Sequence, residues 1–343
     1  MKDNKKHKKA EYGILITGLI ILLAATFVIA LCAGQYSVSV PEVTKILASR
    51  FVNVTKTWSN TAEGVVFTLR LPRIIGAVLV GSALSLSGAA YQGVFKNPLV
   101  APDLLGVSSG ACVGASVAIL LHLNSFGVQA MAFVAGVLAV GLTLFIPHLI
   151  KNTNMTMLVL SGIIVKGIMD SVMGIIKYVA DPETELQSIT YWQLGSLTKV
   201  LPKDLFTVGP VIVAASVIIF LLRWRINILS LGDREAKTLG VSVTIVRNFI
   251  IICATLLTAS AVCISGTIGW IGLVIPHFAR MLTGPDNTKA IPASILIGAI
   301  FMVAIDTLAR ALTSVELPLS ILTGIIGAPF YIIILARQRM KLS

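Results

Sequence analysis

Apolar runs of about 20 residues recur along the whole chain, and each is long enough to cross the hydrocarbon core of a bilayer as a helix. Ten such runs can be drawn, over residues 12–33, 74–94, 104–121, 127–150, 155–180, 205–224, 243–264, 268–283, 291–311 and 318–337. The eighth is short and its bounds are poorly defined. We therefore predict an all-α polytopic membrane protein with ten transmembrane helices, forming one permease-like domain over residues 1–343.

Composition agrees with this class. Hydrophobic residues make up 56% of the chain and charged residues 12%, with a mean hydropathy of +0.92. A soluble domain carries roughly twice that share of charge. The net charge of +12 does not indicate a nucleic-acid partner, because the basic residues flank apolar runs as topology signals do. The four cysteines lie in apolar runs without a C-x-x-C pair, so neither a disulfide framework nor a metal site is predicted.

The amino terminus and the basic residues predict the topology. The first run follows the sequence MKDNKKHKK and is long enough to span, so we interpret it as an uncleaved helix rather than a signal peptide. Ten crossings place both termini on one side of the membrane. With the amino terminus inside, the inner segments hold 17 of the 27 Lys and Arg residues and the outer segments hold eight. The positive-inside rule then predicts cytoplasmic termini.

Three connecting segments are too long to be plain loops. Residues 34–73 and 181–204 are predicted to be extracytoplasmic, and the second is expected to form a short helix on the outer face. The longest inner connector, about 226–243, contains an amphipathic stretch from Leu229 to Val241. Asp233 and Lys237 are spaced i, i+4 in the favourable order, and Gly240 is suited to end a helix.

The stretch from Gly81 to Ala111 interrupts the helical pattern in a characteristic way. Its first part is rich in Gly, Ala and Ser, which lets helix backbones approach closely within lipid. Pro98 and Pro102 lack a backbone donor, so a continuous helix cannot cross this region. An ordinary loop between membrane helices would be polar along its length. This stretch instead has isolated polar residues among apolar ones, at Gln92, Asn97 and Asp103.

The same stretch suggests an internal repeat. Ser87-Gly88, Pro98 and Gly106 recur as Ser265-Gly266, Pro276 and Gly284, all at an offset of 178 residues. The copies are five runs apart, so they would have opposite orientations in the membrane. Inverted repeats of this kind are common in transport proteins, and we expect an inverted five-helix repeat.

These motifs resemble those of the permease subunits of iron-chelate and cobalamin ABC importers. The resemblance covers about residues 12–338 and rests on many short motifs in order. They are Leu69-Arg70-Leu71-Pro72-Arg73, the Q-x4-N-P-L-x2-P-D-L-L-G-x2-S-G-A stretch from Gln92 to Ala111, Trp192 to Leu197, Gly266 to His277, Asp306-Thr307-Leu308-Ala309-Arg310, Glu316-Leu317-Pro318 and Gly327-Ala328-Pro329-Phe330.

The resemblance implies a fold, partners and a location. Two permease subunits, copies or homologues, would stand side by side in the lipid of a bacterial cytoplasmic membrane with the pathway between them. Two cytoplasmic ATPase subunits would drive transport, and an extracytoplasmic substrate-binding protein would deliver the cargo. The chain itself has no G-x4-G-K-[ST] loop, so it is not expected to be an ATPase or another enzyme, nor to hold a cofactor.

The resemblance also assigns roles to single residues. Glu235-Ala236…Gly240 is similar to the docking loop of ABC permeases, although one residue shorter, and makes 226–243 the expected coupling loop. The expected sites are Asp233, Arg234, Glu235, Ala236 and Gly240 for ATPase coupling; Arg70, Arg73 and Arg310 for docking of the binding protein; and Gln92, Asn97, Pro98, Lys166, Asp170 and Pro276 for the pathway and its supporting structure.

The residues alone leave alternatives open. The arginines would serve equally as interfacial anchors, and Arg310 would also pair with Asp306 four residues earlier. Lys166 and Asp170 share a helix face, and intramembrane charges are costly, so we expect them to face the bundle interior or a pathway. A ferric siderophore is the expected cargo because it is the family's commonest, with haem and cobalamin as alternatives. A different class, an ion-coupled secondary transporter, would use Asp170 as an ion site.

Overall fold

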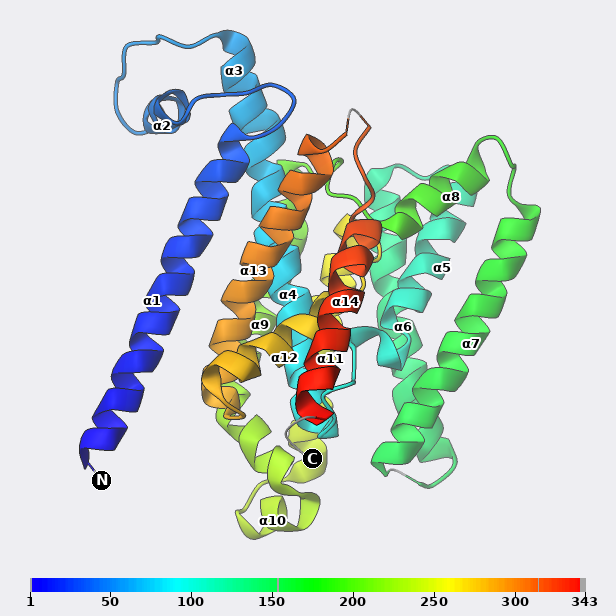
Figure 1. The fold of residues 1–343 in the computed structure, drawn as a ribbon. Coiled ribbons are helices and arrows are strands. Elements are labelled where there is room, and N and C mark those ends of the chain that lie inside the picture. Colours follow the sequence, from blue (N-terminus) through cyan, green and yellow to red (C-terminus); the bar gives the residue numbers. More distant parts are fainter. Residues whose placement is uncertain (1, 153, 314, 340–343) are drawn as a thin grey trace.

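The structure is a computed structural model that describes residues 2–152, 154–313 and 315–339, and in these ranges the chain forms helices and connecting loops (Figure 1). Seven helical segments are long and apolar enough to cross a membrane. They belong to α1 (Lys2–Cys32), the segment ending in α4 (Leu71–Phe95), α6 (Ser125–Leu149), α7 (Met155–Val179), α9 (Pro202–Leu231), α11 (Val243–Ser265) and α13 (Asn287–Ala311). The expected all-helical, multi-pass architecture is confirmed.

Three further apolar helices occupy the remaining predicted runs. They are α5 (Val107–Leu120), α12 (Ile271–Thr283) and α14 (Leu319–Arg339). The apolar part of each is shorter than 18 residues, so length alone does not make them membrane spans. The count of ten crossings therefore remains a prediction.

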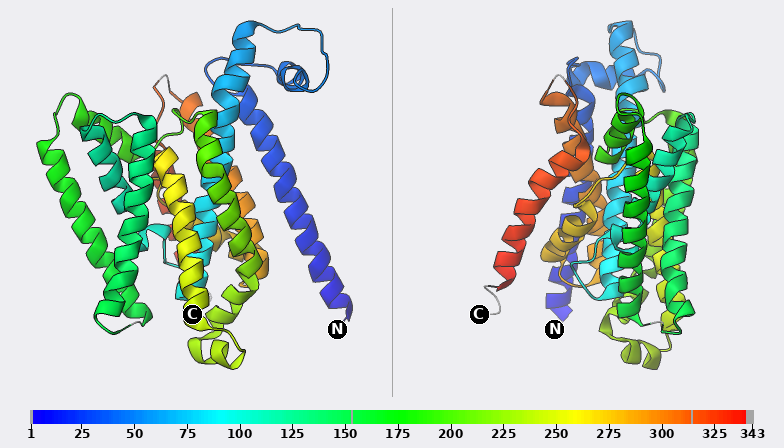
Figure 2. Two further views of the ribbon diagram at one scale, coloured as in Figure 1. Left: turned by 180° about the vertical axis from the view of Figure 1, so that it is seen from behind. Right: turned by 90° about the vertical axis from the view of Figure 1, so that its right-hand side faces the viewer.

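Helix α4 lies at the centre of the bundle. It packs against α9, α11, α12 and α13, and most of its residues are buried. Helix α1 stands at one edge, where only 11% of its apolar window is buried, and α7 stands at the opposite edge (Figures 1 and 2). Helices α5 and α6 pack together between α4 and α7.

The two ends of the bundle carry different small helices. The start of α1, the last described turn of α14 and α10 (Asp233–Thr238) lie at one end, which we call the α10 end (Figure 1). Helices α2 (Val40–Ala48), α3 (Asn60–Gly64) and α8 (Glu185–Leu194) lie at the other, which we call the α8 end. The termini therefore emerge on one side, as predicted, and the outer helix expected within 181–204 is α8.

The second predicted run begins earlier than expected. Helix α3, the π-helical turn Val65–Arg70 and α4 form one continuous helical segment, Asn60–Phe95, instead of starting at residue 74. Pro72 does not end it; the π-helical turn, with its i→i+5 hydrogen bonds, directly precedes this proline inside the continuous segment. The sequence pattern could not show this, because the first turns of the segment are not apolar.

Glycines set how closely α4 meets its neighbours. A Cβ on Gly81 would overlap the carbonyl oxygen of Gly298 in α13, and a Cβ on Gly88 would overlap that of Gly272 in α12. Ser85 adds a hydrogen bond to the Ser294 carbonyl of 2.6 Å. Small residues thus bring the backbones into direct contact, as predicted for this stretch.

The predicted repeat finds little local support. Ser87-Gly88 lies inside α4, whereas Gly266 ends α11; Pro98 lies in a turn, whereas Pro276 lies inside α12. Gly106 and Gly284 share a positive φ, of +82° and +83°, but their ψ values of 10° and −179° give them different conformations. The inverted repeat stays a prediction.

Replacement of Gly88 tests the central packing. We expect Gly88→Ala to lower stability by about 1–3 kcal/mol, because the added methyl group meets the Gly272 backbone and forces α4 and α12 apart. Gly174→Ala in α7 is the matched control, since a Cβ there meets no atom within 4 Å. Thermal unfolding in detergent measures both, and equal midpoints would contradict the packing argument.

Candidate functional site

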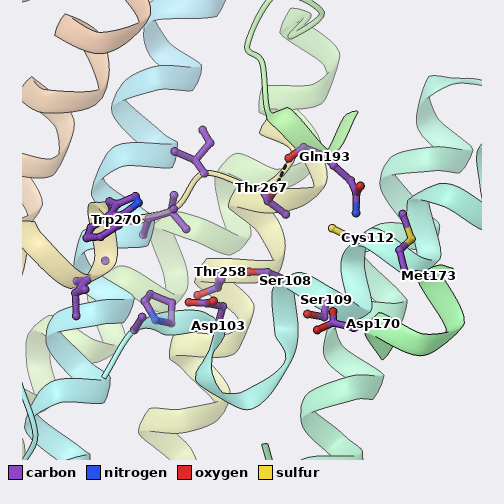
Figure 3. A pocket seen from close by; sticks show the side chains of 17 residues that line it. Asp103, Ser108, Ser109, Cys112, Asp170, Met173, Gln193, Thr258, Thr267 and Trp270 are labelled. Atoms are coloured by element: carbon purple, nitrogen blue, oxygen red, sulfur yellow. Dashed lines mark hydrogen bonds between the residues drawn. The ribbon is translucent and has the colours of Figure 1, made fainter. Parts of the chain in front are cut away.

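A polar cavity of about 320 Å³ opens beside α12, between α5 and α7 (Figure 3). Its lining combines carboxylates, hydroxyl groups and an amide. No Lys, Arg or His is among its lining residues in the described part of the chain. The polar lining residues are Asp103, Ser108, Ser109, Asp170, Gln193, Thr258 and Thr267.

The chain break after α4 forms one wall of this cavity. The 3-10 turn Pro102–Leu105 ends at Gly106, whose φ of +82° redirects the chain into α5. Gly162 of α7 lets the Leu104 carbonyl pack directly on that helix. Asp103 is thereby presented to the cavity from a short turn rather than from a long helix.

Gln92 fastens this break to α12. Its side-chain amide lies 3.2 Å from the Val100 carbonyl and 3.3 and 3.2 Å from those of Gly272 and Leu273, and its oxygen accepts from Arg280. Gln92 is buried, so its expected role in the signature is structural here.

The other signature residues shape the same region. Asn97 accepts a hydrogen bond of 2.9 Å from the Leu99 amide, which forms the turn that contains Pro98. Pro276 is buried inside α12. These residues support the wall, and none of the three lines the cavity.

Trp270 stands at the strained entrance to α12. Its φ of +72° is unusual for a residue with a side chain and costs of order 1–3 kcal/mol. It lines the polar cavity and also an apolar groove between α12, α13 and α14. The preceding segment is tied to the end of α8, because Thr267 donates to the Gln193 carbonyl and the Ser196 amide donates to Ser265 over 2.8 Å.

The two charges predicted in the fifth run separate in the structure. Asp170 lines the cavity, close to Ser109 in Figure 3. Lys166, one turn earlier on α7, does not line the cavity. Both side chains are exposed in a single chain, so the expectation that they face the bundle interior or a pathway stays a prediction.

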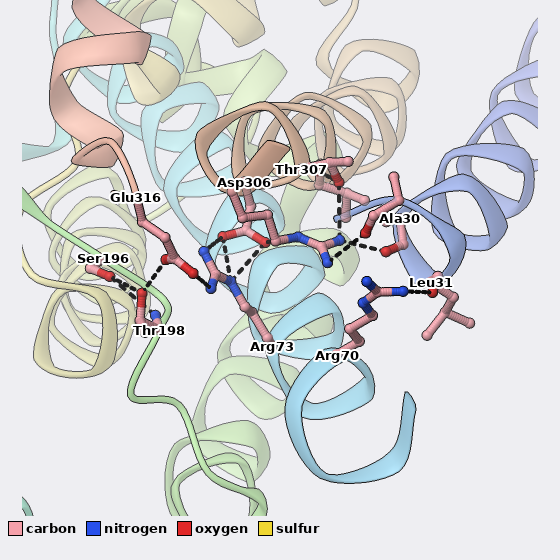
Figure 4. Close-up of polar contacts among 12 residues, drawn as sticks. Ala30, Leu31, Arg70, Arg73, Ser196, Thr198, Asp306, Thr307 and Glu316 are labelled. Atoms are coloured by element: carbon pink, nitrogen blue, oxygen red, sulfur yellow. Dashed lines mark hydrogen bonds and ion pairs between the residues drawn. The ribbon is translucent and has the colours of Figure 1, made fainter. Parts of the chain in front are cut away.

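A network of buried charges lies at the α8 end, where Arg73 meets two carboxylates (Figure 4). Arg73 Nε lies 2.9 and 3.0 Å from the two oxygens of Asp306, and its Nη1 lies 2.8 Å from Glu316. Thr198 donates to Glu316 over 2.5 Å. This network joins α4, α13 and the loops that precede α9 and α14.

Arg70 and Arg310 bind the carboxyl-terminal end of α1 (Figure 4). Arg310 donates to the carbonyls of Ala30 and Ala33 at 2.5 and 3.1 Å, and Arg70 donates to those of Leu31 and Cys32 at 2.7 and 3.1 Å. The last carbonyls of a helix lack intrahelical partners and carry partial negative charge, so cations stabilise them. The two arginines thus cap α1.

These contacts revise the expected basic rim. Arg70, Arg73 and Arg310 have only 5–7% of their surface exposed, and each has protein partners. They are neither free rim charges nor lipid-facing anchors in a single chain. The predicted attraction between Asp306 and Arg310 is present at 3.6 Å, but the bidentate partner of Asp306 is Arg73 from another helix. Spacing along one helix could not reveal that partner.

Helix α10 projects from the α10 end of the bundle (Figure 1). Gly240, with φ of +77°, closes it as a Schellman motif: its amide bonds to the Lys237 carbonyl and the Val241 amide to that of Ala236, both at 3.0 Å. Ala236 is its buried anchor, whereas Arg234 and Glu235 are exposed. The helical stop expected at Gly240 is confirmed, although the helix is shorter than the predicted amphipathic stretch.

Asp233 attaches α10 to two other helices. Its carboxylate lies 2.7 Å from Arg247 of α11 and 3.5 Å from Lys96, which follows α4. The hydrogen bond from Arg247 lowers the pKa of Asp233 below its ordinary value, against a smaller opposing effect of burial. The predicted partner Lys237 is not the one that Asp233 contacts. Asp233 thus positions α10, and Arg234 and Glu235 remain available to a partner.

The fold and these features define a multi-pass helical membrane permease, and comparisons with known proteins give its family. A model of the FecCD transport family matches residues 22–337. The chain belongs to the FecCD transport family, and it is a permease of the ABC importer type.

Relatives and a solved structure agree with this family. The chain is 38% identical to the molybdate import system permease protein MolB of Haemophilus influenzae, over 94% of this chain and 95% of that protein. It is 40% identical to an iron chelatin transport system permease protein of Helicobacter pylori strain 26695, over 80% of this chain and 83% of that protein. A metal-chelate-type ABC transporter in an inward-facing conformation superposes with a TM-score of 0.85, at 35% identity, covering 95% of this chain and 99% of that one.

Glu316 provides a pH-dependent test of the charge network. Partial burial alone would raise the pKa of Glu316, but hydrogen bonds from Arg73 and Thr198 outweigh it and hold the pKa below its usual value. Its stabilising contribution is therefore complete above the unfolded pKa of about 4.3 and is lost as pH falls through the lower folded pKa. We expect Glu316→Gln to lower the unfolding midpoint at pH 7, by a difference that shrinks as the pH is lowered from 5 to 3.

The control for this test is Glu183→Gln, which removes an exposed carboxylate at the same end of the bundle. It should change the midpoint little at either pH. A Glu316→Gln deficit that persists unchanged at pH 3 would show that the carboxylate charge is not what stabilises the network.

Proposed function

We propose that this chain is the membrane subunit of an ATP-driven importer of a ferric chelate, with the α10 end in the cytoplasm. The observation that carries the proposal is α10, an exposed helix that is fixed to α4 and α11 through Asp233 yet leaves its remaining charges free. A helix held in this way suits docking on a separate ATPase subunit. The segments predicted to lie at the α10 end of the bundle hold 17 of the 27 Lys and Arg residues, which supports the cytoplasmic orientation of this end.

The coupling role is tested by changing the charges of α10. In vesicles with ATPase subunits and binding protein, replacing Asp233, Arg234 and Glu235 together with Ala should lower uptake by at least about tenfold, a change of about 1.4 kcal/mol. The permease should still insert and the bundle remain folded, while α10 keeps Ala236 and the Gly240 motif but loses its attachment to Arg247 and Lys96. ATP hydrolysis should no longer respond to cargo.

Two controls sharpen this experiment. Replacing Asp181 and Glu183 with Ala removes two exposed carboxylates at the α8 end and should leave coupling intact. Vesicles without ATPase subunits distinguish the rival class, an ion-coupled secondary transporter that would use Asp170. Uptake that survives the triple substitution with normal ATPase stimulation, or that proceeds without the ATPase, would contradict the proposal.

The charge of the polar cavity supports a ferric chelate over an oxyanion. Asp103 and Asp170 line it, and no cationic side chain does so among the described residues. The carboxylates attract positive charge and hydrogen-bond donors and repel an anion such as molybdate, whereas the hydroxyl groups can donate to or accept from a ligand. A neutral or cationic ferric chelate of the hydroxamate type therefore suits this lining, with haem and cobalamin as the alternative cargoes.

Cargo choice is tested by uptake of labelled cargoes into the reconstituted importer. We expect uptake of a neutral ferric hydroxamate to exceed that of molybdate, haem and cobalamin. Asp103→Asn with Asp170→Asn should reduce it by at least about tenfold, because the loss of even one charge-assisted hydrogen bond, worth about 1.5–3 kcal/mol, gives that factor. Glu183→Gln is the control outside the cavity. Preferred uptake of molybdate, or an unchanged rate in the double variant, would overturn the assignment.

Two permease subunits are proposed to complete the pathway. A cavity of about 320 Å³ lies at the small end of the range for ligand pockets, and a metal chelate with its ligand shell needs more room. Facing cavities of two subunits would supply it. Lys166, exposed on α7, would then lie between subunits or toward cargo.

The α8 end is proposed to receive the substrate-binding protein. The three arginines would serve this docking indirectly, because Arg70 and Arg310 hold the end of α1 and Arg73 holds the loops at Thr198 and Glu316. Their contacts would thus maintain the conformation of the docking surface. Their role in docking remains a prediction.

A further inference from the structure

A cluster of basic and aromatic side chains lies where α1 meets α9 and α13 at the α10 end. The Tyr12 hydroxyl donates to the backbone carbonyl of Lys289 at 3.3 Å, and the Lys289 ammonium lies 5.6 Å from the centre of the Tyr12 ring. Arg223 of α9 and Asp286 at the start of α13 are both within electrostatic reach of Tyr12. Three helices therefore bring two cations and a phenol to one corner of the bundle.

Neither cation of this corner is neutralised by the protein. Arg223 stacks on the Phe220 ring at 3.8 Å and gives one hydrogen bond, of 2.8 Å, to the Phe220 carbonyl. A guanidinium has five N–H donors, so most of them remain available. In the described ranges no carboxylate lies within ion-pair distance of Arg223 or Lys289, although both side chains are half-buried.

Asp286, the carboxylate that acts electrostatically on both Tyr12 and Lys289, makes its hydrogen bonds to other groups. Asp286 accepts from Asn227 at 2.6 Å and from the Thr288 hydroxyl at 2.7 Å, and it caps the start of α13. Asp286 and Lys289 influence each other electrostatically without forming an ion pair. The corner thus keeps an excess of positive charge.

The location of this corner indicates which kind of anion would bind to its cations. Helix α1 is the least buried of the long apolar helices, so lipid contacts it along most of its length. Tyr12 and the 63%-exposed Trp224 are aromatic residues of the kind that sit at the headgroup level. The chain preceding Tyr12 contributes five more lysines, at 2, 5, 6, 8 and 9. Apolar helix surface and basic groups meet here, as the acyl chains and phosphate of a lipid require.

We propose that this corner binds the headgroup of an anionic phospholipid, with Arg223 and Lys289 holding its phosphate and Tyr12 bounding the site. Basic pockets between membrane helices recognise such headgroups through charge-assisted hydrogen bonds. The bound lipid would join the loosely packed α1 to α9 and α13. This site depends on the chain being in a membrane and is independent of its cargo.

Lipid retention by the full-length permease tests the site. The protein is purified in neutral detergent, given equal amounts of phosphatidylglycerol and phosphatidylcholine, and analysed by native mass spectrometry. We expect preferential retention of phosphatidylglycerol, and a loss of at least about fivefold in Arg223→Gln with Lys289→Gln. Tyr12 bonds to the backbone of residue 289, so this substitution leaves that contact in place.

Matched variants separate a built site from general charge. Lys199→Gln with Lys203→Gln removes two cations at the α8 end and should retain the lipid as the unmodified protein does. Arg223→Lys, which keeps the positive charge, should retain most of the preference for phosphatidylglycerol over phosphatidylcholine. Inorganic phosphate at millimolar concentration should not displace the lipid if the acyl chains contribute; displacement would reassign the corner to free phosphate. Equal retention of the two lipids, or unchanged retention in the Arg223 and Lys289 variant, would overturn the proposal.

Discussion

The direct contact of α4 with α12 and α13 is the constraint on which the rest of the bundle depends. In lipid, apolar side chains gain little by meeting one another, so close backbone approach and hydrogen bonds must hold the helices. Gly81 and Gly88 permit that approach, and Ser85 adds a hydrogen bond across it. With α4 fixed at the centre, its two ends place the remaining features: the charge network at one end, and the chain break with Gln92 at the other.

The buried charges follow from the same constraint. A charge within the membrane is costly unless it is paired, and removing one partner from a buried pair costs about 3–5 kcal/mol. Asp306 is therefore paired with Arg73. Arg310 and Arg70 donate hydrogen bonds to the last carbonyls of α1, which lack partners within that helix. This arrangement gives α1, otherwise hardly packed, a fixed position at the α8 end. Toward its other end, the Tyr12 hydroxyl bonds to the Lys289 carbonyl of α13, which is where the proposed lipid would act.

Much of this could be predicted from the sequence, because hydropathy and special residues act locally. The apolar runs gave the helices, Gly240 marked the end of α10, and the small residues of α4 marked its close packing. The partners of Arg70, Arg73 and Asp233 could not be predicted, because each lies on a helix distant in sequence.

A continuous chain of contacts joins the proposed docking helix to the cavity. Asp233 holds α10 against Lys96, which directly follows α4. One turn earlier, Gln92 ties α4 to the Val100 carbonyl and to the start of α12, and the next residues present Asp103 to the cavity. A displacement of α10 would therefore reach the cavity wall through one short, hydrogen-bonded segment. Trp270, beside Gly272 at the entrance to α12, has a positive φ and therefore a strained backbone. A displacement that reached α12 would act on this strained residue. Between α10 and the cavity, Gln92 is the residue whose side chain bonds both to the chain break at Val100 and to the start of α12.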